Sequence, residues 1–208
     1  MTRLSTIPQA LAQVKRGRLI IVVDNPRREN EGDFYLPAEL ITPRQVAFMV
    51  THGRGLLCVP LTQGRARQLR LPLMVPRHKN TETTGISFTV SVNANNGGSG
   101  ISAHDRARTI SLLADPKTRP GQLTRPGHVF PLIAHPKGLA VRDGHTEAAV
   151  ALAQAAGFAP VGVLCEILRD DGRMARLPDL LKLARKYGLA VISISDLKKY
   201  LKSAKPQR

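Results

Sequence analysis

The chain has 208 residues, and 42% of them are hydrophobic, so it is long enough to bury a sizeable core in one domain. No segment approaches the roughly 20 consecutive apolar residues of a membrane span. The N-terminus also lacks the pattern of a secretory signal, so we expect a cytoplasmic protein with no membrane association. Cys58 and Cys165 lack CxxC spacing and are predicted to be reduced, buried thiols.

The net charge of +16, from 31 Lys and Arg against 15 Asp and Glu, favours anionic partners. One hypothesis is therefore a nucleic-acid-binding protein. Against it, basic residues never exceed two in a row, and aromatic residues make up only 4% of the chain, with no Trp to stack on bases. We expect instead a basic surface that attracts anionic small molecules and binds polyanions nonspecifically.

The first third of the chain alternates helical and strand-like patterns. Ile7, Leu11 and Val14 recur at helical spacing ahead of Gly17, and Thr42-Pro43-Arg44-Gln45 has capping-box spacing. In chain order we expect a helix that stops at Gly17, a buried strand over 18–23, a strand over 34–36, a helix from Pro43 to Gly53 and a buried strand over 56–59.

The remainder continues the alternation, which predicts one α/β or α+β domain over residues 1–208. Residues 86–92 alternate apolar and polar side chains, as a half-buried strand does, and 93–100 read as a flexible loop. The basic end of the chain is expected to fray from about residue 201. The other expected elements are a short helix and loop over 63–80, a helix from Ser102 to Leu113, a connector over 116–126, strands over 127–133, 161–167 and 189–194, and helices over 146–157 and 178–187.

The segment Arg28-Glu29-Asn30-Glu31-Gly32-Asp33 carries three carboxylates and a guanidinium within six residues. Four charges cannot be buried cheaply in one loop, so they call for a cation or a polar ligand. Closely spaced oxygen donors suit a hard divalent ion such as Mg²⁺. A solvated turn is the alternative, but the loop follows a buried-looking strand that can present it to a cleft.

A second candidate site is the helix start Arg142-Asp143-Gly144-His145-Thr146-Glu147. The free N–H groups and positive dipole end of a helix make a natural phosphate seat, to which Arg142 and Thr146 can add donors. His145 considered alone is better explained as an ordinary exposed histidine.

Two further residues are candidates with competing explanations. Glu166 interrupts an apolar strand, where partial burial would raise its pKa toward the range of general acid–base catalysis, although a strand-end position explains it equally well. His128 follows Pro126-Gly127, and it is equally well explained as a histidine that hydrogen-bonds a loop carbonyl.

Six motifs in order resemble the 3,4-dihydroxy-2-butanone 4-phosphate synthase family, from about Leu11 to Tyr200. The resemblance implies an enzyme of riboflavin biosynthesis that converts D-ribulose 5-phosphate to that product and formate. It also implies a mixed sheet flanked by helices. Some relatives continue into a GTP cyclohydrolase II domain, so this chain is expected to be monofunctional. The motifs are Arg28–Asp33, His52-Gly53-Arg54-Gly55, Gly100–Ala107, Arg125–Pro131, Gly144–Ala148 and Asp170–Arg176.

The resemblance implies roles for particular residues. Glu29 and His145 would be the protein ligands of two Mg²⁺ (or Mn²⁺) ions per active site. His128, Glu166 and Asp33 would be catalytic, moving protons while the substrate enolises, loses water, rearranges and expels formate. The family forms homodimers with active sites at the subunit interface. The implied substrate-binding residues are Arg28, Glu29, Asp33, Arg142, Asp143, Gly144, His145, Thr146 and Glu166.

The chain departs from the family pattern in two places. The family carries further acids before the arginine of the acidic loop, where this chain has Asp24 followed by Asn25-Pro26-Arg27. Two adjacent threonines normally precede Gly100, where this chain has Gly98-Ser99. A divergent paralogue that binds a sugar phosphate with weak or altered activity is therefore the alternative to a full lyase.

Overall fold

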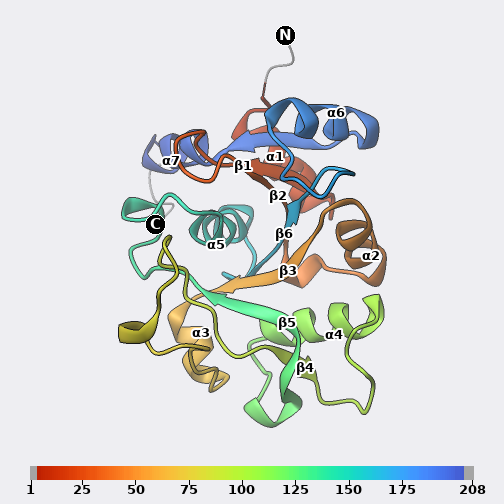
Figure 1. The fold of residues 1–208 in the computed structure, drawn as a ribbon, viewed down its shortest axis with the longest axis vertical. Coiled ribbons are helices and arrows are strands. Elements are labelled where there is room, and N and C mark those ends of the chain that lie inside the picture. The colour runs from red at the N-terminus through yellow and green to blue at the C-terminus, as the bar shows by residue number, and fades with distance from the viewer. Residues whose placement is uncertain (1–3, 204–208) are drawn as a thin grey trace.

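The computed structural model describes residues 4–203, which form a mixed sheet with helices on both faces (Figure 1). The strand order is β4-β5-β3-β6-β2-β1-β7. The strands are β1 (Ile20–Val23), β2 (Gly32–Pro37), β3 (Arg54–Leu61), β4 (Val92–Ala94), β5 (Leu123–Ile133), β6 (Gly162–Ile167) and β7 (Ala190–Ser193).

The helices pack in two layers, one on each face of the sheet. Helices α2, α3, α4 and α6 contribute to one buried cluster, and α1, α5 and α7 to the other. The predicted α/β class with a mixed, helix-flanked sheet is confirmed. The helices are α1 (Ile7–Lys15), α2 (Pro43–His52), α3 (Gln63–Gln68), α4 (Ala103–Ala114), α5 (His145–Ala156), α6 (Leu177–Tyr187) and α7 (Ile194–Ser203).

Local sequence sets several of these boundaries. The side chains of Thr42 and Ser102 accept hydrogen bonds from backbone N–H groups in the first turns of α2 and α4. Gly157 and Gly188 end α5 and α6 in the left-handed region, with φ of 89° and 64°, where glycine meets no Cβ penalty. Within residues 4–203, no helix is long and apolar enough to cross a bilayer.

One row of residues crosses three neighbouring strands and positions the site. Val22 on β1 pairs with Asp33 on β2, and Asp33 pairs with Glu166 on β6. Side chains alternate between the faces of a strand, and Phe34 and Cys165 belong to the α2/α4/α6 cluster. The side chains of Asp33 and Glu166 therefore lie on the opposite face, which α5 covers.

The predicted strand over 86–92 is wrong for most of its length. Phe88 and Thr89 form only isolated bridges, and regular pairing begins at Val92. Thr89 is fully buried although the alternation predicted it to face outward. Its single hydroxyl proton has two backbone carbonyl oxygens within reach, those of Val90 and Pro131, so this buried polar group is satisfied without a regular ladder.

Three predicted irregular segments are partly regular. Asn93 and Ala94 belong to β4, not to a flexible loop, and 123–126 belong to β5 rather than to a connector. At the other end, 201–203 continue helix α7, and the rest of the tail that was expected to fray, residues 204–208, lies outside the described range. In β3, Leu56 is exposed, whereas Leu57, Cys58 and Val59 are buried as predicted.

Candidate active site

The carboxylate of Asp24 organises the acidic loop after β1. Its Oδ1 accepts the backbone N–H of Glu31 at 2.8 Å, and its Oδ2 accepts the N–H of Glu29 at 3.0 Å. The guanidinium of Arg28 donates to the same Oδ2 at 3.2 Å. From the sequence, Asp24 stood out only as the last acid before the loop. Its role as the acceptor for the loop's N–H groups arises only when the loop folds back on itself, so the sequence did not predict it.

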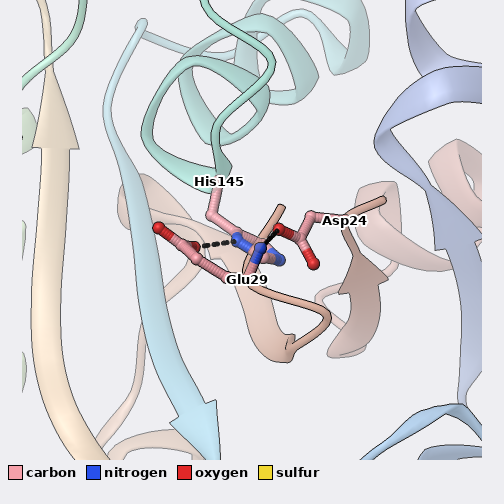
Figure 2. Close-up of side chains that lie close together, drawn as sticks. All are labelled: Asp24, Glu29 and His145. Atoms are coloured by element: carbon pink, nitrogen blue, oxygen red, sulfur yellow. Dashed lines mark hydrogen bonds and ion pairs between the residues drawn. The ribbon is translucent and has the colours of Figure 1, made fainter. Parts of the chain in front are cut away.

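His145, the first residue of α5, meets the acidic loop (Figure 2). Its Nε2 lies 3.2 Å from the carbonyl oxygen of Val22, which can only accept, so the proton of the neutral ring is on Nε2. The Nδ1 atom lies 3.8 Å from Oε2 of Glu29. A lone pair on nitrogen and a carboxylate oxygen therefore converge from segments more than 100 residues apart.

This pair fits a divalent cation. Donor atoms of Asp24, Glu29 and His145 all lie within 4.8 Å of one another. The oxygens of Asp24 accept three N–H groups, whereas Oε2 of Glu29 accepts one, from Arg28, so Glu29 and His145 are the more available donors. A histidine whose other nitrogen donates to a backbone carbonyl is the usual arrangement of a metal ligand, because that bond fixes the ring and its tautomer.

A cavity of about 250 Å³ opens beside this pair. Five acids against two arginines give its lining an excess of negative charge, although the chain as a whole is strongly basic. Asp33 is buried and Glu29, Glu31 and Glu166 are half-buried, so carboxylates at this density need counter-charges, which supports a cation site. The charged and polar lining residues are Arg28, Glu29, Glu31, Asp33, Glu82, Thr84, Arg142, His145, Thr146 and Glu166.

The site perturbs the acid–base properties of its groups. The adjacent imidazole of His145 lowers the pKa of Glu29, and the charge of Arg28 assists. Burial acts to lower the pKa of His145, but the negative charges of Asp33, Glu29 and Asp24 outweigh it and raise the pKa to about 9. Without a cation the ring therefore carries a second proton at neutral pH, and a bound cation would take the place of the proton on Nδ1. Burial raises the pKa of Asp33 to about 7. Asp33 is therefore poised to exchange a proton near neutral pH.

Glu166 sits in a backbone cradle formed by the start of β3. Its Oε2 accepts the N–H of Leu56 at 2.8 Å. A Cβ at Gly55 would lie 2.5 Å from the same oxygen, so only glycine leaves room for the carboxylate. Burial raises the pKa of Glu166 despite this hydrogen bond. The glycines of the predicted motif at 52–55 thus clear space for an acid more than 100 residues away.

Some residues at the helix start, 142–146, line the cavity, and others do not. Arg142 and Thr146 line it, and Arg142 is held by Glu147, with Nη1 to Oε2 at 2.6 Å, and by the carbonyl of Thr84 at 3.3 Å. Asp143 instead pairs with Lys198 of α7 at 2.6 Å. Gly144 N-caps α5, and a Cβ there would overlap the guanidinium of Arg142.

His128 is not among the residues that line this cavity. It is exposed on β5, and its hydrogen bonds run to Asn93 on β4. The segment 82–86 does line the cavity, held by three hydrogen bonds to Oε2 of Glu82, and sequence reasoning missed it. No local pattern marks that segment as a site wall, because tertiary packing alone brings it there.

A half-buried carboxylate and a buried imidazole lie close together beside titratable acids in a mixed α/β fold. This arrangement is typical of an enzyme site that can hold a cation and bind a small polar substrate. A family model described as 3,4-dihydroxy-2-butanone 4-phosphate synthase matches residues 8–200. The chain belongs to this family, as its six motifs predict.

Individual relatives agree. The riboflavin biosynthesis protein RibBA of Aquifex aeolicus (strain VF5) is 49% identical over 201 residues, 95% of this chain and 49% of that protein. This chain therefore spans about half the length of that relative. A crystal structure of a 3,4-dihydroxy-2-butanone 4-phosphate synthase with two magnesium ions has a TM-score of 0.90 and 41% identity, covering 96% of this chain and 98% of that one. The Candida albicans enzyme has a TM-score of 0.88 and 43% identity, covering 98% and 100%.

Proposed function

We propose that this protein converts D-ribulose 5-phosphate to L-3,4-dihydroxy-2-butanone 4-phosphate and formate in riboflavin biosynthesis, as a single domain in the cytoplasm. The observation that carries the proposal is the convergence of Glu29 and His145 beside the N-terminus of α5. Family membership supplies the reaction. The acidic lining and the adjoining basic groups together suit a substrate that is anionic at one end and rich in oxygen donors at the other.

The substrate phosphate is proposed to bind at the N-terminus of α5. Free N–H groups there carry partial positive charge, and Arg142 and Thr146 lie in both this cavity and an adjoining one of about 350 Å³. Because Arg142 is already fixed by Glu147, it can bind phosphate with little further loss of side-chain freedom. Asp143 would take part through its backbone, since its carboxylate pairs with Lys198.

Glu29 and His145 would hold Mg²⁺ or Mn²⁺, with two ions per site and with water and substrate oxygens completing the coordination. A divalent cation in such a site supplies Lewis-acid stabilisation of negative charge on a substrate oxygen. Arg28 contacts both Glu29 and Asp24, so it keeps the loop in place and adds a donor toward the substrate.

Asp33 and Glu166 are proposed to move protons. A carboxyl group with a pKa of about 7 can accept the proton next to the substrate carbonyl and return it later. Glu166, whose pKa burial raises, can serve as a proton donor to a leaving hydroxyl. Their positions as register partners let both act on one bound substrate.

His128 is proposed to act across a homodimer interface. It is exposed and lies outside the cavity of its own chain. Leu56, whose N–H holds Glu166, is 39% exposed, and Ile101 is 51% exposed. A second copy that covers these apolar groups would bring its own His128 to the site. The high basic charge leaves nonspecific polyanion binding as an additional expectation.

The deciding experiment is formate release from D-ribulose 5-phosphate by the purified protein with Mg²⁺. Formate in equal amount to consumed substrate is expected. Thermal stabilisation by the substrate without formate release would instead identify a divergent paralogue.

The shared site has its own test. His128→Gln and Glu166→Gln proteins should each be inactive alone, whereas co-refolded mixtures should recover about one quarter of wild-type activity, because half of the dimers contain one intact site. No recovery in dimers shown to be mixed would contradict the shared site.

A further inference from the structure

Asn93 on β4 holds His128 on β5 at two points. The backbone N–H of His128 donates to Oδ1 of Asn93 at 2.8 Å. The Nδ2 atom of the same amide lies 3.2 Å from Nδ1 of the His128 ring. In the described part of the chain, Nδ1 makes the only side-chain hydrogen bond of His128. The ring is therefore fixed through Nδ1, and Nε2 is the nitrogen left to meet another molecule.

These contacts determine where the imidazole proton lies. A backbone N–H can only donate, so it identifies the amide oxygen of Asn93, and the other end of the amide must be the NH₂ group. The carbonyl oxygen of Ser99, 3.5 Å from Nδ2, agrees with this orientation. An NH₂ group can only donate, so Nδ1 of His128 accepts. The neutral ring then carries its proton on Nε2.

The seat of Asn93 depends on two glycines. Gly100 has φ of 82°, and a Cβ there would overlap the side-chain amide of Asn93. A Cβ at Gly127 would overlap the backbone of Val92, which β4 places directly before Asn93. Asn93 itself is buried, whereas His128 is exposed. The buried amide of Asn93, for which Gly100 and Gly127 leave room, thus fixes the exposed imidazole of His128.

We infer that Asn93 is a positioning residue that holds His128 as the Nε2–H tautomer, so that this histidine offers the substrate a hydrogen-bond donor rather than a base. The inference rests on the proposed role of His128 in the reaction. A neutral imidazole N–H aimed at a substrate oxygen stabilises the negative charge that develops there during enolisation. The proton stays on Nε2, and proton abstraction falls to the carboxylates.

The tautomer can be measured on the whole protein without any variant. In ¹⁵N–¹H long-range correlation spectra at neutral pH, with His128 assigned by the loss of its signals in His128→Gln, Nδ1 should resonate as an unprotonated nitrogen and Nε2 as a protonated one. In Asn93→Asp, the carboxylate accepts only, so the proton should move to Nδ1. A protonated Nδ1 in the wild-type protein would overturn the inference.

Kinetics then connect the tautomer to the reaction. Asn93→Asp should lower kcat about 100-fold, the usual effect of losing one donor to a developing oxyanion, with little change in KM. Asn95→Ala is the matched control, because its amide donates to Gly121 O and not to a histidine, and it should keep both tautomer and kcat. If Asn93→Asp switches the tautomer but leaves kcat unchanged, the inference that Nε2–H of His128 stabilises the developing charge on the substrate is wrong. Full activity in His128→Gln would instead refute the proposed role of His128 and leave the tautomer result standing.

Discussion

Asp33 on β2 and Glu166 on β6 are register partners, and both line the cavity that contains Glu29 and His145. Burial raises the pKa of both carboxyl groups, and the charge of Glu166 further raises the pKa of Asp33. Two such acids side by side do not both ionise easily near neutral pH, so one can hold a proton while the other accepts one. In the proposed mechanism, this pairing supplies an acid and a base for proton transfer.

Asp33 should make the stability of the metal-free protein depend on pH. Its pKa is about 7 in the fold against a reference value of 3.8, so between these values the folded protein holds a proton that the unfolded chain has lost. The free energy of unfolding should therefore fall as pH rises, by at most about 1.4 kcal/mol per unit for this group. Urea unfolding in EDTA between pH 4 and 6 should show a smaller decline for Asp33→Asn than for wild type. Parallel curves for the two proteins would contradict this.

Removing either proposed metal ligand should abolish turnover. Glu29→Ala and His145→Ala each take one of two protein donors from the cation, so formate release should fall at least about 100-fold and Mg²⁺ or Mn²⁺ affinity should fall with it. Calorimetric titration with Mn²⁺ and the formate assay measure the two effects. Lys199→Ala, an exposed pair partner of Asp196 on α7, is the control and should change neither. Undiminished metal binding in both ligand variants would place the cation elsewhere.

Asp24→Asn tests whether the loop, rather than the ligands alone, makes the metal site. The substitution puts an NH₂ group where an oxygen accepts N–H groups from the loop. We expect metal affinity to fall about 10- to 100-fold and the free energy of unfolding to fall by about 1–3 kcal/mol. Titration with Mn²⁺ and urea unfolding provide the two measurements. Loss of stability with intact metal affinity would show that Glu29 is positioned independently of Asp24.

Gly55→Ala should displace Glu166. The new Cβ would come within 2.5 Å of Oε2, so the carboxylate must leave the N–H of Leu56 or the strand must shift. We expect kcat to fall about 100-fold, within the range for losing a general acid–base group, with a smaller effect on KM. Gly64→Ala in α3 is the control, because its Cβ meets nothing closer than 3.8 Å and a helical alanine is favourable by up to about 1 kcal/mol. Equal kcat in both variants would show that Glu166 does not need the hydrogen bond from Leu56 or the space that Gly55 leaves.

Much of the fold was predictable because its signals are local. Apolar periodicity, Thr and Ser caps and terminal glycines located most helices and buried strands. The alternation over 86–92 wrongly predicted a regular half-buried strand. Thr89 can be buried because its hydroxyl has backbone carbonyl oxygens within hydrogen-bond distance. Segments with many asparagines and glycines also resisted prediction, since Asn93 joins a strand whose partner lies some 30 residues downstream.

The site was only partly predictable, and for a related reason. The acidic loop and the helix start at His145 each place several charged or polar residues within six positions, so both are recognisable in the sequence. The residues that support the proposed catalytic groups look ordinary in isolation, such as Gly55 beside Glu166 and Asn93 beside His128. Their significance comes from distances across the sheet, which one sequence without its fold does not contain.

The bond between His145 Nε2 and the Val22 carbonyl spans 123 positions of the chain. A nascent chain in which α5 has not yet packed on the sheet has the acidic loop but not the imidazole, so it would bind a cation at the proposed site only weakly. Cation binding would therefore report that the early strands and the later helix have docked, and the bound ion would in turn stabilise that docking.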